Sequence, residues 1–203
     1  MYDLFQTDEN ISENLLPYDG DVRYLPIGIE PLMAERYVDS LFHTIAWQHD
    51  EAIMFGKRIV TKRKVAWYAD QPFSYTYSKT TKTALPWTPL LKELKQIVEA
   101  STGEHFNACL LNLYHDGSEG MAWHSDGERE LVPRAAIASL SFGAERKFSF
   151  KHKTTKETFS LNLASGSILI MRGATQSYWL HRLPPTKKVS APRINLTFRS
   201  MRT

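Results

Sequence analysis

The stretch Arg193-Ile-Asn-Leu-Thr-Phe-Arg199 alternates polar and apolar side chains without interruption. In an extended chain successive side chains point to opposite faces, so its polar residues share one face and its apolar residues share the other. The polar face consists of Arg193, Asn195, Thr197 and Arg199. An arginine that faces inward needs a carboxylate or phosphate to offset its desolvation, which would make this face an anion site. The alternative is an ordinary edge strand with its polar face in water, and alternation alone does not separate the two.

The same two-residue period runs through the second half of the chain. Short alternating runs separated by turn residues predict strands at 106–114, 135–142, 147–151, 157–163, 167–171 and 193–198. The first half has helical spacing instead. One apolar stripe follows Pro31, and a second has Thr88 as N-cap, Pro89 at the first helical position and Gly103 after its end. Helices followed by many short strands predict an α+β chain, a β-sandwich or jelly roll with the helices packed outside.

Composition indicates one globular domain. The chain has 203 residues, 42% hydrophobic and 23% charged, which is enough to bury a core without disulfide or metal staples. Its single cysteine, Cys109, excludes an internal disulfide and a thiolate cluster, so a metal would need histidine and carboxylate ligands. No apolar run approaches the roughly 20 residues that span a bilayer, and no signal-peptide pattern begins the chain. We therefore expect a soluble, cytoplasmic protein, or a nuclear one in a eukaryote.

Charge divides the chain into an acidic arm and a basic body. Residues 1–30 hold seven acids against Arg23, a net charge of −6, and since the whole chain carries +3, residues 31–203 carry +9. A basic body favours an anionic partner, although it also serves solubility. The patterns predict a surface arm at 1–30 and a single domain at 31–203, with hairpins at 53–78 and a jelly-roll core at 106–201.

Three residues in the second half have the chemistry of metal ligands. His124 and Asp126 lie two apart, so their side chains point to the same side of an extended chain, and His181 follows on a short run closed by two prolines. Two histidines and one carboxylate are the ligands of non-haem Fe(II) oxygenases, and they leave open positions on the metal. Each part alone also fits an ordinary role, the first pair in a surface loop and His181 as a hydrogen-bonded residue at a strand end.

Asn112 and Tyr114 share one face of the strand that precedes His124, opposite two leucines. Each can donate a hydrogen bond to the same acidic ligand as the arginine face. Tyr114 also fits the edge of a core as an amphipathic side chain.

Together these motifs resemble the AlkB family of Fe(II)- and 2-oxoglutarate-dependent dioxygenases. The resemblance rests on Asn-Leu-Tyr at 112–114, His124-x-Asp126, His181 and the stretch 193–199. It extends from about residue 53 to residue 201 and is closest to the branch that repairs duplex DNA, which the phrases at 126–131, 141–143 and 187–196 also resemble. Residues 1–30 have no such resemblance.

The resemblance implies a double-stranded β-helix, a jelly roll, that holds Fe(II) between His124, Asp126 and His181. It implies that 2-oxoglutarate chelates the iron through its keto acid end and that Arg193 pairs with its distal carboxylate. Further contacts to this co-substrate would come from Asn112, Tyr114, Asn195, Arg199 and, more weakly, Thr197. Six residues span about 20 Å along an ideal strand, so the two arginines meet one small ligand only by reaching toward each other.

The implied reaction is oxidative demethylation of bases such as 1-methyladenine and 3-methylcytosine in DNA. Dioxygen is the second co-substrate, 2-oxoglutarate becomes succinate and carbon dioxide, and the hydroxylated methyl group leaves as formaldehyde. The implied partner is alkylated DNA, both duplex and single-stranded, with no membrane and no obligate protein partner. We expect a monomer.

The resemblance also assigns residues to the DNA. The implied contacts are Met54, Phe55, Gly56, Lys57, Arg63, Tyr75, Tyr77, Ser78 and Glu128. Phe55 would act as a wedge in the base stack, assisted by Met54 and Arg63, with Lys57 near the backbone. Five cations lie within the eight residues 57–64, which is also typical of a solvated face.

The flipped base would lie against Tyr75, Tyr77 and Ser78. Aromatic faces with Glu128 nearby favour a methylated, positively charged base over its neutral parent. Tyr75 and Tyr77 also fit a structural aromatic ladder. Gly127 stands where the resemblance leads us to expect an acid, which leaves the lesion preference open.

Two other functions fit parts of the pattern. One keeps the fold and cofactors but acts on methylated RNA or on a protein side chain. Phe55 discriminates the two functions, because a duplex wedge matters little for single strands. The other is a non-catalytic jelly-roll module that binds nucleic acid, which has no need to keep the metal ligands and Arg193 together.

Overall fold

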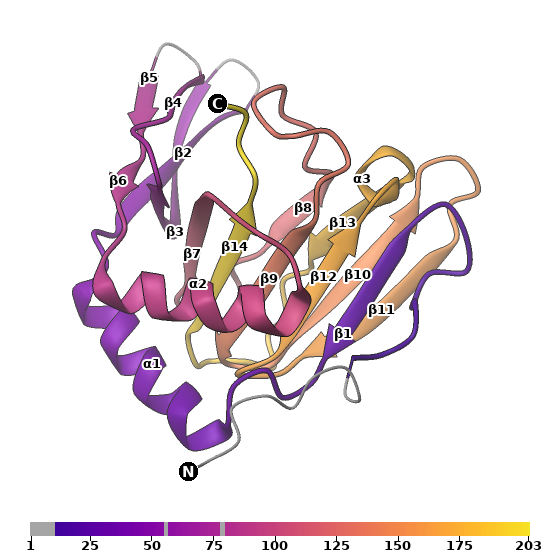
Figure 1. Ribbon diagram of the computed structural model, residues 1–203, viewed down its shortest axis with the longest axis horizontal. Coiled ribbons are helices and arrows are strands. Elements are labelled where there is room, and N and C mark those ends of the chain that lie inside the picture. The colour runs from indigo at the N-terminus through magenta and orange to yellow at the C-terminus, as the bar shows by residue number, and fades with distance from the viewer. Residues whose placement is uncertain (1–10, 55–56, 78–79) are drawn as a thin grey trace.

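The computed structural model describes residues 11–54, 57–77 and 80–203 (Figure 1). The larger sheet contains β1 (Asp21–Leu25), β2 (Gln48–Met54), β3 (Lys57–Ala69), β6 (Leu85–Pro86), β7 (Ala108–Tyr114), β9 (Ile137–Gly143), β12 (Ile168–Arg172) and β14 (Arg193–Arg199). The smaller sheet contains β8 (Met121–His124), β10 (Arg146–His152), β11 (Thr158–Leu163) and β13 (Trp179–Leu183). A separate hairpin consists of β4 (Ser74–Tyr77) and β5 (Thr80–Thr83). The helices are α1 (Pro31–Thr44), α2 (Pro89–Thr102) and α3 (Thr175–Tyr178).

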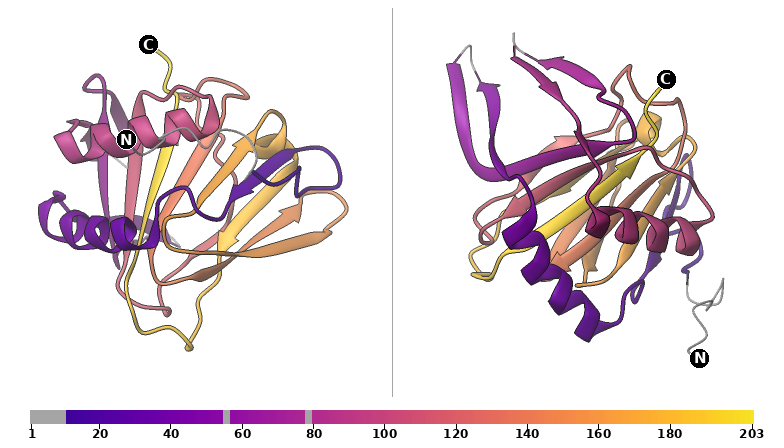
Figure 2. Two further views of the ribbon diagram at one scale, coloured as in Figure 1. Left: turned by 60° about the horizontal axis from the view of Figure 1, so that its bottom comes forward. Right: turned by 60° about the vertical axis from the view of Figure 1, so that its left-hand side comes forward.

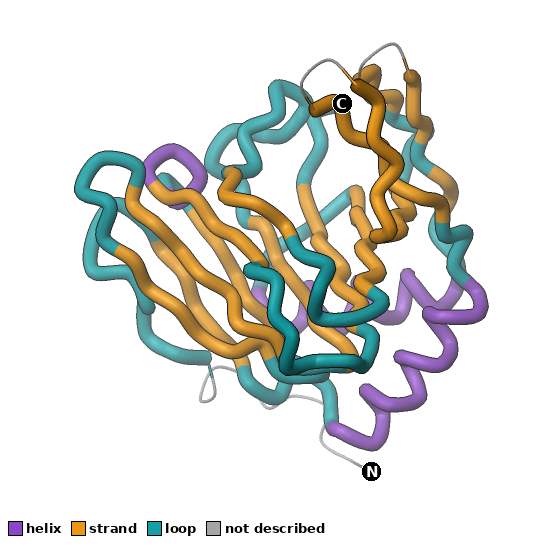
Figure 3. Tube along the Cα trace, turned by 180° about the vertical axis from the view of Figure 1, so that it is seen from behind, coloured by secondary structure: helices purple, strands orange, loops and turns teal. Residues whose placement is uncertain are grey.

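The two sheets form the jelly roll that the strand pattern predicted. The larger one has the order β1-β12-β9-β14-β7-β3-β2, with β6 beside β3, and the smaller one has the order β11-β10-β13-β8. Apart from β3 and β6, all paired strands are antiparallel. Residues of both sheets share one apolar cluster, which contains Val22, Phe150 and Trp179. The side opposite the view of Figure 1 is formed mainly by strands and their loops (Figure 3).

The two long helices pack on the outer face of the larger sheet, as the sequence predicted (Figure 2). At the start of α2 the Thr88 hydroxyl accepts a hydrogen bond from the backbone N–H of Leu91 at 3.2 Å, and Gly103 ends the helix with a left-handed φ of 68°. The side chains of Leu41, Leu91, Leu94 and Val98 pack in the core beneath the helices. Within the described ranges, no helix is long and apolar enough to cross a membrane.

The cap of α2 gives a first testable prediction. Thr88→Ala removes the side-chain acceptor of Leu91 N–H, so we expect a loss of about 1 kcal/mol in the free energy of unfolding. For a chain of this length that corresponds to a fall of roughly 2–4 °C in the thermal midpoint. Thr44→Ala is the matched control, because the exposed Thr44 hydroxyl only donates back to Ser40 O. Equal losses in both variants would contradict the cap.

The faces of β14 follow the alternation of its sequence. Ile194, Leu196 and Phe198 belong to the core beneath the helices, and the polar residues lie on the opposite face, toward the smaller sheet. β14 is paired on both sides, with β7 and with β9, so the edge-strand alternative for this stretch is wrong. The polar face is therefore buried inside the jelly roll.

Residues 11–30 differ from the predicted surface arm. β1 pairs with β12 along its whole length, from Asp21 opposite Arg172 to Leu25 opposite Ile168. Leu16 and Val22 are buried in the cluster between the sheets. Of the described acids in this segment, Glu13, Asp19 and Glu30 are exposed, so acidic charge on its accessible side coexists with apolar side chains that belong to the domain.

Two hairpins occupy the region where the sequence predicted them at 53–78. β2 and β3 pair from Gln48 opposite Val65 to Met54 opposite Lys57, and β4 pairs with β5. Both hairpins project from the rest of the molecule in the right-hand view of Figure 2. β3 also extends the larger sheet, since Lys64 to Ala69 pair with β7. The hairpin region is thus continuous with the jelly roll and runs from Gln48 to Thr83.

Candidate metal centre and adjoining pocket

The three predicted metal ligands meet where two neighbouring strands of the smaller sheet pair. His124 ends β8 and lies opposite His181 on β13, and Asp126 follows in the next loop. One ligand atom from each residue lies within 4.8 Å of the others. Asp126 Oδ1 is 3.8 Å from His124 Nε2 and 3.9 Å from His181 Nε2. His181 follows the other two residues by more than fifty positions, yet its donor atom lies near theirs.

The protonation states at this point suit a metal ion. Burial lowers the pKa of His181 to about 4, so its imidazole is neutral at physiological pH and has a free lone pair. Burial alone would raise the pKa of Asp126, but the electrostatic interaction with Arg199, with smaller contributions from His181 and His124, holds that pKa below its usual value. His124 Nδ1 lies 2.8 Å from Ala122 O, which leaves Nε2 for a metal. Imidazole nitrogens and one carboxylate are donors that fit Fe(II).

Arg199 connects the candidate ligand Asp126 to a second acid. Its Nη2 is 2.8 Å from Asp126 Oδ2, and its Nη1 is 3.8 Å from Glu128 Oε1. This pairing fixes one oxygen of Asp126 and leaves Oδ1 toward the histidines. The resemblance implied that Arg199 contacts 2-oxoglutarate; the structure places its guanidinium on Asp126, beside the position where that co-substrate would meet a metal.

Arg193 is a buried cation without a carboxylate partner in the described part of the chain. Its Nη2 donates to Ser141 Oγ at 3.0 Å, its guanidinium lies 5.7 Å from the centre of the Tyr114 ring, and its Nε has no hydrogen-bond partner. Burial lowers its pKa to about 10, so the side chain remains charged at neutral pH. A buried charge of this kind is costly unless an anion pairs with it. A ligand carboxylate fits this position.

The polar side chains on the same face as Arg193 differ in whether the protein already satisfies their hydrogen bonds. Asn195 Nδ2 donates to Ser139 Oγ at 2.7 Å, and Thr197 Oγ1 donates to Asn195 Oδ1 at 3.1 Å. Asn112 is the cross-strand neighbour of Asn195, and its buried Oδ1 has no partner among the described residues. Hydrogen bonds to neighbouring side chains therefore occupy Asn195 and Thr197, whereas Asn112 and Arg193 retain polar atoms for a ligand.

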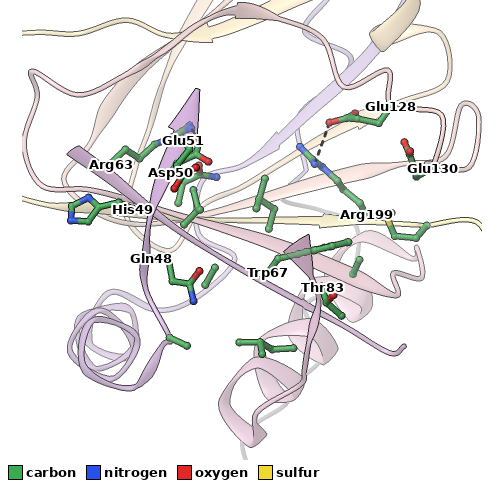
Figure 4. Close-up of a pocket in the computed structure, with 18 of the residues that line it drawn as sticks. Gln48, His49, Asp50, Glu51, Arg63, Trp67, Thr83, Glu128, Glu130 and Arg199 are labelled. Carbon is green, nitrogen blue, oxygen red and sulfur yellow. Dashed lines mark hydrogen bonds and ion pairs between the residues drawn. The ribbon is translucent and has the colours of Figure 1, made fainter. Parts of the chain in front are cut away.

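A cavity of about 500 Å³ adjoins this centre (Figure 4). Trp67 and Arg63 on β3 form one wall, and Glu128, Glu130 and Arg199 form the other. Its lining combines apolar and aromatic side chains with many polar and charged ones, so a ligand there would meet both an apolar surface and hydrogen-bonding groups. Arg199 lies between the cavity and the metal centre. In Figure 4 a dashed line marks its ion pair with Glu128.

The described side chains include two of the predicted DNA contacts, Arg63 and Glu128. Arg63 is paired with Asp50, and its Nη1 lies 3.5 Å from Met121 Sδ on β8, so this cation bridges the β2–β3 hairpin and the strand of His124. Glu128 lines the cavity. The other predicted contacts lie outside the described residues, either entirely, as for Phe55, Gly56 and Ser78, or in their side chains, as for Met54, Lys57, Tyr75 and Tyr77.

Sequence reasoning missed several residues that hold the site in place. Ser139 and Ser141 on β9 bond to Asn195 and Arg193, and their alternation with apolar residues was a usable signal. Gln176, on the four-residue helix α3, accepts a hydrogen bond from the backbone N–H of Asp126. No motif or period marks Gln176.

Comparisons with known proteins agree with this geometry. The model of a family described as the 2OG-Fe(II) oxygenase superfamily matches residues 21–199. The mouse protein named DNA oxidative demethylase ALKBH2 is 44% identical over 156 residues, covering 73% of this chain and 65% of that protein. The human protein named alpha-ketoglutarate-dependent dioxygenase alkB homolog 3 is 38% identical over 178 residues, covering 83% and 62%. An Arabidopsis thaliana protein named DNA oxidative demethylase ALKBH2 is 33% identical over 211 residues, covering 91% and 67%.

The chain spans about two thirds or less of the length of these mammalian relatives. A solved structure, titled "The structure of OsALKBH1", matches with a TM-score of 0.62 and 15% identity, over 91% of this chain and 99% of that one. At this identity the match bears on the fold alone, and it agrees with the jelly roll described above.

Proposed function

The chain belongs to the AlkB family within the 2OG-Fe(II) oxygenase superfamily, and from this premise we propose that it is an oxidative demethylase of alkylated DNA bases. Its cofactors are those of the family: Fe(II), 2-oxoglutarate and O2. One observation carries the proposal: three side chains with metal-ligand chemistry converge next to Arg199 of β14, and the same face of that strand carries Arg193, a buried arginine without an acidic partner among the described residues. The proposed substrate is inferred from the relatives described above, since the mouse and Arabidopsis thaliana proteins are named DNA oxidative demethylases.

His124, Asp126 and His181 would hold the metal. When bound there, Fe(II) supplies the oxidation of an N-methyl group by O2, with 2-oxoglutarate as the source of two electrons. Arg199 orients the Asp126 carboxylate by occupying Oδ2, so that Oδ1 is available on the side of the histidines. Because the pKa of His181 is low, no proton needs to leave its imidazole before a metal binds.

Arg193 would bind the distal carboxylate of 2-oxoglutarate, and Asn112 is a second group with an unpartnered atom in the same interior. The charge-assisted pair would both anchor the co-substrate and neutralise a cation that is otherwise costly to bury. Tyr114 and Ser141, which already contact Arg193, keep its guanidinium on the inner face.

The cavity beside Arg199 would receive the base. Glu128 at its wall supplies a negative charge, which favours a methylated and positively charged ring over its neutral parent. The two hairpins, β2–β3 and β4–β5, are the proposed nucleotide-recognition elements, with Phe55 as the wedge and Tyr75 and Tyr77 beside the flipped base. The sequence of the hairpins supports duplex as well as single-stranded DNA as substrate.

An oligonucleotide panel tests this function. Duplex and single-stranded DNA with 1-methyladenine or 3-methylcytosine is incubated with the iron-loaded protein, and formaldehyde and succinate are measured. We expect both products in equal amounts, only with iron and 2-oxoglutarate, and neither with His124→Ala. Succinate formation with methylated RNA or a protein substrate, and none with any methylated DNA, would overturn the DNA proposal in favour of that substrate. Iron binding without any 2-oxoglutarate turnover would support the non-catalytic module.

The proposed wedge gives a second prediction. Phe55→Ala removes the group that would fill the space left by a flipped base. A partly unstacked step costs a few kcal/mol, and about 1.4 kcal/mol already corresponds to tenfold, so we expect activity on duplex DNA to fall by at least about tenfold. Activity on single strands, which need no wedge, should change little. Phe42→Ala, at an exposed phenylalanine of α1, is the control. Equal losses on both substrates would remove the wedge.

A further inference from the structure

The short helix α3 lies directly before the strand that carries His181 and contacts the loop that carries Asp126. Gln176 Oε1 accepts a hydrogen bond from the backbone N–H of Asp126 at 2.9 Å, although the two residues are 50 positions apart. The amide nitrogen of the same side chain lies 3.3 Å from Met171 Sδ at the end of β12. Gln176 is therefore held at one end by the larger sheet while its other end holds the loop.

Lys153 makes a second connection to the same loop. Its Nζ donates to Ser125 Oγ at 3.0 Å and to the backbone oxygen of Gln176 at 2.8 Å. Ser125 is the residue between His124 and Asp126. The backbone N–H of Lys153 also donates to Tyr178 O at 2.8 Å, at the end of α3. Lys153 thus ties the loop and the helix together at both of its ends.

These contacts matter because Asp126 is outside the strand ladder. β8 ends at His124, so the sheet does not fix the backbone of Asp126, and this residue is 7% exposed. A buried N–H group needs a hydrogen-bond partner, and Gln176 supplies it. Arg199 fixes the carboxylate end of Asp126 and Gln176 fixes its backbone end. With both ends held, Oδ1 has one position relative to the histidines.

We propose that Gln176 and Lys153 are positioning residues of the metal centre, and that Gln176 sets its metal affinity through the backbone of Asp126. Neither side chain is among the three ligand donors. Groups that orient metal ligands typically change metal affinity by roughly 10- to 100-fold when they are removed. The inference rests on the proposed metal centre and is independent of the identity of the DNA substrate.

Cobalt(II) titration of the full metal-free chain tests this inference, with the visible absorption of the bound ion as the readout. We expect Gln176→Ala to weaken Co²⁺ binding by roughly 10- to 100-fold. Gln176→Glu keeps an acceptor oxygen at the same reach, so its affinity should remain close to that of the unaltered chain. Ser177→Ala is the matched control, because Ser177 is the exposed neighbour on the same helix. The thermal midpoint of each metal-free variant is measured in parallel.

Co²⁺ affinity that is unchanged in Gln176→Ala would overturn the inference, as would a loss that Gln176→Glu shares. Should Gln176→Ala fail to fold, Lys153→Met decides, since it removes the ammonium contacts to Ser125 and to α3 but keeps the length of the side chain. Weaker Co²⁺ binding in Lys153→Met then supports the inference, and unaltered binding contradicts it. Failure of the unaltered chain to bind Co²⁺ would instead refute the metal centre itself.

Discussion

Asp126→Ala is expected to abolish metal binding and to lower demethylation by more than about a thousandfold, because the site loses the one anionic donor that the described residues give it. The same change should also destabilise the metal-free protein. Arg199 would keep a buried charge with only Glu128, at 3.8 Å, as an acidic partner among the described residues. Removal of one partner from a buried ion pair costs about 3–5 kcal/mol in the free energy of unfolding. Denaturant unfolding and Co²⁺ titration measure the two effects separately.

A double variant distinguishes the two roles of Asp126. Asp126→Ala combined with Arg199→Met replaces the whole ion pair by apolar groups, which is often neutral for stability. We therefore expect the double variant to recover most of the lost stability while metal binding and turnover remain absent. Metal binding that survives Asp126→Ala would remove this residue from the centre. A double variant as unstable as the single one would show that the Arg199 contact contributes little to the fold.

The alternation of Arg193–Arg199 was sufficient to predict which side chains share a face, because that property depends only on local geometry. It was not sufficient to decide whether the polar face is buried. That depends on β7 and β9 pairing with both sides of β14, which is a long-range property. Only after the pairing is known does the missing partner of Arg193 become informative.

The two arginines of β14 illustrate the same limit more sharply. Both are arginines on the same face of the strand, and the sequence predicted that both contact 2-oxoglutarate. In the structure Arg193 faces Ser141 and Tyr114, whereas Arg199 faces Asp126, so the strand serves two neighbouring positions. The spacing of six residues indicated that separation, but nothing in it identified the partners.

Net charge misled the interpretation of residues 11–30 for a physical reason. Charge describes the accessible side of a segment and says little about the apolar residues between the acids. Leu16 and Val22 were too few to establish a period, yet they are buried between the sheets. Gln176 had even less signal, since its proposed role depends on a hydrogen bond to a residue 50 positions away.

Arg193→Met is expected to raise the KM for 2-oxoglutarate by at least about a hundredfold, since the loss of one partner from a buried charge-assisted pair is worth roughly 3 kcal/mol or more. The free energy of unfolding of the metal-free protein should not fall, because a methionine replaces a buried cation without an acidic partner in the described chain. Arg193→Lys keeps the charge but loses the two-pronged geometry, so its KM should be intermediate. Succinate formation at varied 2-oxoglutarate gives KM, and denaturant unfolding gives stability.

Arg146 is the matched control, because it is equally buried but its two terminal nitrogens are bonded to the protein backbone, with only Nε lacking a partner among the described residues. It donates to the backbone oxygens of Asp116, Gly117, Glu119 and Pro184. Arg146→Met leaves these carbonyls without their side-chain donor, so it should cost at least about 2 kcal/mol of stability and change the KM for 2-oxoglutarate much less than Arg193→Met does. The two substitutions therefore have opposite expected signatures. If Arg193→Met behaved like Arg146→Met, with lower stability and an unaltered KM, Arg193 would be a structural residue and the co-substrate carboxylate would have to bind elsewhere.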